Sequence, residues 1–199
     1  MLSVKNLQRP GLAPCSFTVP TGTCTALTGP SGSGKTLLLR ALIDLDENTG
    51  CVAVDDQERA TYAAPDWRRC VGYLPAEPGW WADKISDHFV DVKAAEPILN
   101  SIGLKPDILD QYVETASTGE RQRLALVRLL AMEPRVLLLD EPTAALDDAT
   151  VETVERLLTD QFSKGTSILL VSHDQDQANR LCRQWLTIKN GQVREKKIP

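Results

Sequence analysis

Apolar runs separated by amphipathic segments predict a chain in which strands and helices alternate. Two runs, Arg135–Leu139 and Ser167–Val171, are almost wholly apolar, as is typical of strands that are covered on both faces in a parallel sheet. Between them, Asp148–Phe162 has the spacing of an amphipathic helix. Repetition of this alternation favours an α/β fold with a mostly parallel central sheet.

The remaining segments extend the same pattern. From Lys84 to Tyr112 a helical pattern is interrupted by Pro97, Gly103 and Pro106, which predicts a small subdomain of short helices. The other expected elements are strands at Leu2–Leu7, Cys15–Val19, Thr23–Thr28, Gly50–Asp55 and Cys70–Leu74, helices at Lys35–Asp44, Gly119–Met132 and Gln175–Arg183, and a hairpin at Trp185–Val193 that turns at Asn190-Gly191.

Length and composition narrow the class of protein. The 199 residues are enough for one well-buried domain, and 42% hydrophobic with 25% charged residues argues against disorder. The formal net charge of -5 gives no overall attraction to nucleic acid or to anionic lipid. We therefore expect a single domain, residues 1–199, with no nucleic-acid partner.

The five cysteines lack the C-x-x-C spacing of zinc or redox motifs, which favours small buried thiols in a reducing compartment. No run approaches the ~20 apolar residues of a spanning helix, and the first residues lack a signal-peptide core. We expect a cytoplasmic protein that reaches a membrane only through a partner.

The strongest chemical motif is Gly29-Pro30-Ser31-Gly32-Ser33-Gly34-Lys35-Thr36, which matches G-x-x-x-x-G-K-[ST] between a predicted strand and a predicted helix. Its glycines let successive N–H groups converge on phosphate at a helix N-terminus. Lys35 is expected to reach the β- and γ-phosphates, and the Thr36 hydroxyl to hold Mg²⁺. The motif predicts a P-loop that binds a nucleotide such as ATP.

Asp140 and Glu141 follow a predicted buried strand directly, at the edge where ligands bind in open α/β sheets. Asp140 suits Mg²⁺, and Glu141 can polarise a water for attack on phosphate. Two acids before Pro142 could instead cap the following turn.

His173 follows the next predicted strand, within Ser172-His173-Asp174. A lone histidine after a strand is often a satisfied structural residue. If the two strands are parallel neighbours, His173 reaches the same edge as Glu141 and comes within reach of a γ-phosphate.

With these motifs in order, the chain resembles the ATP-binding cassette (ABC) ATPases over essentially its whole length. GPSGSGKT resembles their Walker A motif, VLLLDEP resembles Walker B with its catalytic glutamate, and Ser172-His173-Asp174 resembles the H-loop. Ala145-Leu146-Asp147 stands where that family has its D-loop, and Ser117-Thr118-Gly119-Glu120 stands where it has its LSGGQ signature.

The resemblance implies a P-loop NTPase fold with an antiparallel β subdomain and a helical subdomain inserted at about 78–130. It implies catalysis by Glu141, His173 and Lys35. It also implies that two chains, in a homodimer or a heterodimer with another ABC subunit, dock head to tail around ATP. Ser117, Gly119 and Asp147 would then join the nucleotide site, and hydrolysis would drive a separately encoded membrane permease.

Three positions depart from the family pattern. Ala76 stands at the position of a glutamine that ligates Mg²⁺ and positions water, and the neighbouring Glu77 is a possible substitute ligand. Thr118 replaces a signature glycine, while Glu120 adds an anion. No aromatic residue precedes Phe17 to stack on adenine. Slow hydrolysis and loose base selectivity are the expected consequences.

Trp80-Trp81 either faces a partner, as residues of this region do in the family, or fills the core of the helical subdomain. A soluble ABC ATPase acting on nucleic acid or ribosomes is a rival function, although the chain lacks the coiled coil or second cassette usual there. A slow regulatory nucleotide switch is another rival, favoured by Ala76 and the altered signature.

Overall fold

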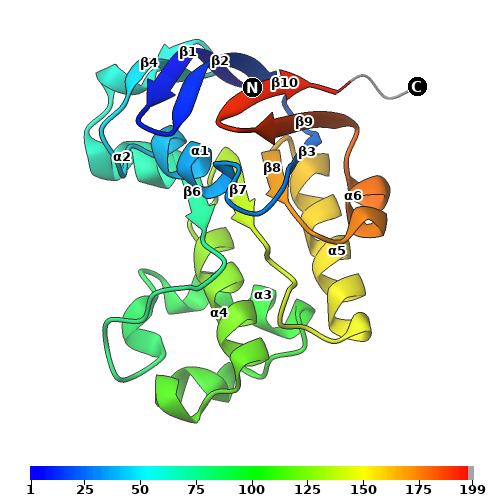
Figure 1. The fold of residues 1–199 in the computed structure, drawn as a ribbon. Helices are drawn as coiled ribbons and strands as arrows, with labels where there is room; N and C mark the ends of the chain where they lie inside the picture. Colours follow the sequence, from blue (N-terminus) through cyan, green and yellow to red (C-terminus); the bar gives the residue numbers. More distant parts are fainter. Residues whose placement is uncertain (197–199) are drawn as a thin grey trace.

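Two sheets with different strand directions organise residues 1–196, the part of the chain that the computed structural model describes (Figure 1). One is a four-stranded antiparallel sheet of order β2-β1-β4-β5, and the other is a six-stranded sheet of order β10-β9-β3-β8-β7-β6. The strands are β1 (Leu2–Arg9), β2 (Leu12–Val19), β3 (Cys24–Thr28), β4 (Thr49–Val54), β5 (Gln57–Glu58), β6 (Val71–Leu74), β7 (Val136–Asp140), β8 (Ser167–Val171), β9 (Gln184–Lys189) and β10 (Gln192–Glu195).

The larger sheet is parallel except for β10, which forms the predicted hairpin with β9. Its centre is buried on both faces. Leu137 and Leu139 of β7 belong to one hydrophobic cluster, whereas Leu138 belongs to the other. This two-sided burial explains why β7 and β8 are continuous apolar runs instead of alternating ones.

Within residues 1–196, six α-helices accompany these sheets. Helix α1 packs between them, α5 and α6 cover the opposite face of the larger sheet, and α3 and α4 form a lobe at the far end from the antiparallel sheet (Figure 1). Their bounds are α1 Lys35–Leu42, α2 Ala64–Cys70, α3 Val92–Ser101, α4 Thr118–Leu130, α5 Asp148–Ser163 and α6 Gln175–Leu181. Short 3₁₀ turns lie at Arg59–Thr61, Ser86–His88, Pro106–Asp110 and Val113–Thr115.

The expected fold class is confirmed, one helix was missed, and one local expectation is wrong. Helix α2 was not predicted from the sequence, because Trp67 is its only buried side chain and leaves no apolar stripe. Pro97 does not break the helical pattern but lies inside α3. A proline there removes one helical hydrogen bond, and buried Ala95 and Leu99 anchor the turns on either side.

Within residues 1–196, none of the helices combines the length and the apolar character that crossing a bilayer requires. The five cysteines are free thiols, and Cys15, Cys24 and Cys182 are buried, whereas Cys51 and Cys70 are partly exposed.

Candidate nucleotide site

The P-loop lies between the end of β3 and the start of α1. Gly29 passes so close to β9 that a Cβ atom on it would lie 2.2 Å from the carbonyl oxygen of Ile188. Gly34, the N-cap of α1, has a φ of +108°, which residues other than glycine rarely adopt. The Lys35 ammonium donates to the carbonyl oxygens of Gly29 at 2.9 Å and Pro30 at 3.1 Å. The backbone of the loop therefore wraps around the ammonium group of Lys35.

Thr36 and Asp140 meet from two different elements. The Thr36 hydroxyl, on the first turn of α1, donates to Oδ2 of Asp140 at 2.7 Å. Asp140 ends β7 and is only 4% exposed. Burial and the nearby Asp140 carboxylate raise the pKa of Tyr73, on the adjacent strand β6, to about 12. A hydroxyl and a carboxylate thus converge beside the P-loop, and oxygen donors of this kind suit Mg²⁺.

Glu141 and His173 are brought together because β7 and β8 are parallel neighbours whose last residues, Asp140 and Val171, are in register. The backbone N–H of His173 donates to Oε2 of Glu141 at 3.1 Å. The His173 Nε2 atom lies 3.2 Å from Oε1, without the geometry of a hydrogen bond. Burial raises the pKa of Glu141 above the usual value for a glutamate, and the His173 N–H and imidazole offset part of the rise.

One cavity of about 370 Å³ joins these groups. Its lining includes Lys35, Thr36, Asp140, Glu141 and His173. It also contains Ser31, Gly32, Gly34, Leu37 and Ala76. No aromatic residue is among the described residues that line this cavity.

Asp140 and Glu141 face the cavity, whereas Glu77 does not line it among the described residues. The carboxylates of Asp140 and Glu141 accept hydrogen bonds from Thr36 and His173, so they face the P-loop and the end of β8 and not the turn at Pro142. Glu77 is exposed, and the cavity lining includes Ala76 but not Glu77 among the described residues.

Ser117, Gly119 and Asp147 lie outside the lining of this cavity. Ser117 caps α4 in a reciprocal capping box: its hydroxyl accepts from the Glu120 N–H at 3.2 Å, and the Glu120 carboxylate accepts from the Ser117 N–H at 2.8 Å. Asp147 caps α5 by accepting from the Thr150 N–H at 3.0 Å. The structure therefore divides the sequence-predicted residues between a cavity and two helix N-termini.

Two buried glutamines to which the sequence assigned no role support the loop after β7. Gln122 donates from Nε2 to the carbonyl oxygens of Glu141 and Pro142, each at 3.4 Å. Gln177 donates to the Thr143 hydroxyl at 3.1 Å. Both are amides on otherwise apolar helix faces, and this break in the apolar pattern was the available signal.

The tryptophan pair divides between its two predicted environments. Trp80 is partly buried and packs against the hydrophobic cluster that includes α3 and α4. Trp81 is 71% exposed. One residue therefore belongs to the core of the helical lobe, and its neighbour lies on the surface.

Comparisons with known sequences agree with this arrangement. A family model described as ABC transporter matches residues 12–144. An aliphatic sulfonates import ATP-binding protein of Pseudomonas syringae pv. syringae (strain B728a) is 39% identical over 86% of this chain and 61% of its own length. A methionine import ATP-binding protein of Yersinia pestis bv. Antiqua (strain Antiqua) is 35% identical over 93% of this chain and 59% of its own length. The chain thus spans about three fifths of these curated relatives.

Solved structures extend the similarity to the whole fold. The ATP-binding subunit of an ABC transporter matches with a TM-score of 0.89 at 25% identity, over 99% of this chain and 90% of that one. A dimeric ATP-binding cassette in a post-hydrolysis state, bound to ADP and phosphate, matches with a TM-score of 0.87 at 25% identity, over 100% and 99% of the two chains.

Proposed function

The chain belongs to the ABC transporter family, and we propose that it is an ATP-binding and ATP-hydrolysing subunit that drives a separately encoded membrane permease. The observation that carries the proposal is the single cavity in which Lys35, Thr36, Asp140, Glu141 and His173 meet. A nucleoside triphosphate is the substrate class that fits a P-loop facing two carboxylates.

In this proposal each side chain has a separate task. Lys35 balances the charge of the transferred γ-phosphoryl group. Glu141 accepts a proton from the attacking water, a role that its raised pKa favours because a general base works best near the operating pH. His173, whose N–H holds the Glu141 carboxylate, orients that base and lies beside the γ-phosphate.

The residues also fit a magnesium ion. The Thr36 hydroxyl and the Asp140 carboxylate are hard oxygen donors, and their mutual hydrogen bond places both at the same point. The ion would supply charge neutralisation between the β- and γ-phosphates.

A head-to-tail dimer, homomeric or heteromeric, completes the proposed site. Ser117, Gly119 and Asp147 do not line the cavity of their own chain. The first N–H groups of α4 have no acceptor within the helix, which makes its N-terminus a suitable contact for phosphate supplied by a second chain. In such a complex the chain would lie at the cytoplasmic face of the membrane through its permease.

The enzymatic proposal is tested by replacing Lys35 with alanine. We expect Mg²⁺-dependent ATP hydrolysis by the purified wild type. The rate should decrease by about 10²-fold or more in the variant, because the lysine charge that stabilises the transferred phosphoryl group is lost. The control is Lys93→Ala, which removes an exposed lysine of α3. Equal phosphate release by wild type and Lys35→Ala, measured with the native membrane partner present, would overturn the proposal.

A second test uses pH. Glu141 must be ionised to act as a base, and its pKa is raised chiefly by burial. ATP turnover at saturating substrate should therefore fall as the pH drops, with a midpoint above the usual pKa of an exposed glutamate. A kcat–pH profile checks this. A midpoint at or below the value for an exposed glutamate would contradict the role given to Glu141.

A further inference from the structure

Two buried thiols meet on the face of the larger sheet that α5 and α6 cover. The Sγ atoms of Cys24 and Cys182 lie 3.2 Å apart, although the two residues are 158 positions apart in the sequence. Cys24 begins β3, and Cys182 directly follows α6. Neither residue lines the cavity around Lys35. The proposed mechanism of ATP hydrolysis therefore leaves this pair of sulfur atoms unused.

The backbone holds the two cysteines together. Strands β3 and β9 are parallel neighbours that pair from Thr25 and Gln184 onward (Figure 1). Just before this pairing, the N–H of Arg183 donates to the carbonyl oxygen of Cys24 at 2.9 Å. The hydrogen bond places the residue after Cys182 beside Cys24. The register of the sheet thus sets the contact between the two sulfur atoms.

A disulfide requires only a small movement from this arrangement. The sulfur atoms of a disulfide are about 2.05 Å apart, so the pair has to approach by about 1 Å from its present contact. Both side chains belong to one hydrophobic cluster, together with Leu181 and Trp185 beside Cys182. Rotation of two short side chains supplies a movement of this size and leaves the strand pairing intact.

The other cysteines have no such partner. Cys15 donates its S–H to the carbonyl oxygen of Leu7 at 3.4 Å, and neither Cys51 nor Cys70 contacts another sulfur atom in the described part of the chain. A metal is a poorer explanation of the pair, because structural zinc takes four protein ligands. Among residues 1–196, no cluster of three or more His, Cys, Asp or Glu side chains suited to a metal includes these thiols.

The two sulfur atoms differ in their surroundings. The contact with Cys182, together with burial, holds the pKa of the Cys24 thiol well above its usual value, so Cys24 stays protonated. Cys24 is 1% exposed. Cys182 is 5% exposed, and it lies at the end of a seven-residue helix, next to the exposed Arg183. Cys182 is therefore the sulfur that a small oxidant reaches first.

From this geometry we propose that Cys24 and Cys182 form an oxidation site whose substrate is a small hydroperoxide and whose product is an intrachain disulfide. The Cys182 thiolate attacks the peroxide, the O–O bond breaks, and Cys182 becomes a sulfenic acid. The other peroxide oxygen takes the Cys182 proton and leaves as water or an alcohol.

The second step forms the crosslink. The Cys24 sulfur attacks the sulfenic sulfur of Cys182, the S–O bond breaks, and the hydroxide leaves with the Cys24 proton as water. The two thiols together lose two electrons, and the peroxide gains them. A reducing dithiol returns the pair to its thiol form.

The crosslink ties together two segments that belong to the nucleotide site. Strand β3 leads into the P-loop, and α6, whose end Cys182 follows, begins just after His173. Because the two residues are already in contact, the bond leaves both segments in place. It also joins positions far apart in the sequence, and a crosslink over a long stretch of chain restricts the unfolded state most. The oxidised protein should therefore be more stable than the reduced protein.

Peptide mapping of wild-type protein treated with hydrogen peroxide tests the site. The map should contain Cys24 joined to Cys182 within one chain. The melting temperature should rise by roughly 5–15 °C, and dithiothreitol should reverse both changes. Cys15→Ala is the matched control, because it removes another buried thiol and should leave the crosslink unchanged.

Counting thiols gives a second measurement. Cys51→Ser combined with Cys70→Ser removes the two partly exposed thiols, so three of the five cysteines remain. In this variant, hydrogen peroxide should lower the number of thiols titrated in denaturant from three to one. The expected loss of two thiols corresponds to one disulfide.

Two single substitutions distinguish the roles of the two sulfur atoms. In Cys24→Ala, hydrogen peroxide should leave a sulfenic acid on Cys182, which dimedone traps. In Cys182→Ala, dimedone should label Cys24 about 10-fold less, because a protonated and fully buried thiol is a poor nucleophile. Equal labelling of the two variants would contradict the assigned order of the steps.

The inference does not depend on ATP hydrolysis, because no step uses a nucleotide. A wild-type peptide map without the Cys24–Cys182 link would overturn it, as would a disulfide that joins two chains. A melting temperature that stays the same when the link forms would overturn the stabilising role. Faster crosslinking by oxidised glutathione than by hydrogen peroxide at equal concentration would exclude a hydroperoxide as the preferred substrate.

Discussion

Replacing Glu141 with glutamine should reduce ATP turnover by about 10²–10⁴-fold, the range that a general base contributes. The amide keeps the shape of the side chain and can still contact the backbone N–H of His173. In the wild type this N–H donates to Oε2 of Glu141 at 3.1 Å. ATP binding should therefore survive, because Lys35 and Thr36 are unchanged. Under the proposed dimer mechanism, the variant should accumulate as an ATP-bound dimer.

Phosphate release and size-exclusion chromatography with and without ATP measure the two effects. The control is Glu152→Gln, which changes an exposed acid on α5 and should behave as the wild type does. Turnover within a few-fold of wild type in Glu141→Gln would remove Glu141 from the proposed mechanism.

Adding one methyl group at Gly29 should be nearly as damaging. In Gly29→Ala the new Cβ would lie 2.2 Å from the Ile188 carbonyl oxygen and 2.8 Å from the Ser33 hydroxyl. The P-loop must therefore move away from β9. Overpacking of this kind costs about 1–3 kcal/mol of stability, and a displacement of about 1 Å in a positioning element costs about 10²-fold in activity.

Gly79→Ala is the matched control, because a Cβ there has nothing within 4 Å. Thermal unfolding reports the loss of stability, and ATPase assays at a temperature where both variants are folded report the loss of activity. If Gly29→Ala matches Gly79→Ala in both measurements, the close approach of the P-loop to β9 is not required.

The sequence predicted the central sheet and the grouping of the P-loop with Asp140, Glu141 and His173, for a physical reason. Strands buried on both faces, such as β7 and β8, must be apolar throughout. The polar residues that follow these strands therefore lie at one edge of the sheet. The register of Asp140 with Val171 places Glu141 beside His173.

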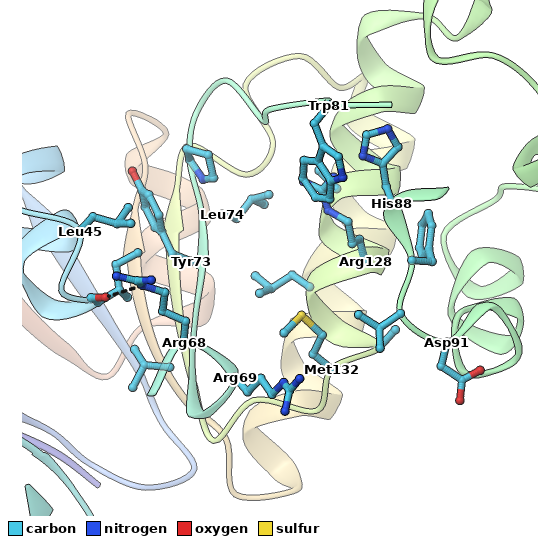
Figure 2. Close-up of a pocket in the computed structure, with 18 residues that line it drawn as sticks. Leu45, Arg68, Arg69, Tyr73, Leu74, Trp81, His88, Asp91, Arg128 and Met132 are labelled. Atoms are coloured by element: carbon cyan, nitrogen blue, oxygen red, sulfur yellow. Dashed lines mark hydrogen bonds between the residues drawn. The ribbon is translucent and has the colours of Figure 1, made fainter. Parts of the chain in front are cut away.

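The hollow between β6 and the C-terminal half of α4 (Figure 2), whose base is lined by Val71, Leu74, Ala125 and Leu129, could not be predicted in the same way. Its exposed apolar residues come from separate segments, with Leu45 after α1, Val90 before α3 and Met132 after α4. Each residue taken alone is an ordinary surface residue. Only the folded backbone brings them together with Arg128, and the sequence indicated no more than that Trp80-Trp81 could face a partner.

Helix α4 forms a rigid connection between its two ends. Ser117 caps its first turn, and Arg128 lies in its last turn, so the two residues are roughly 16 Å apart along the axis at about 1.5 Å per residue. The helix is braced against β6, where a Cβ on Gly72 would lie 2.4 Å from the Leu129 side chain. A thirteen-residue helix without an internal proline behaves as a stiff strut. A force applied at Arg128 would therefore be transmitted along α4 to Ser117.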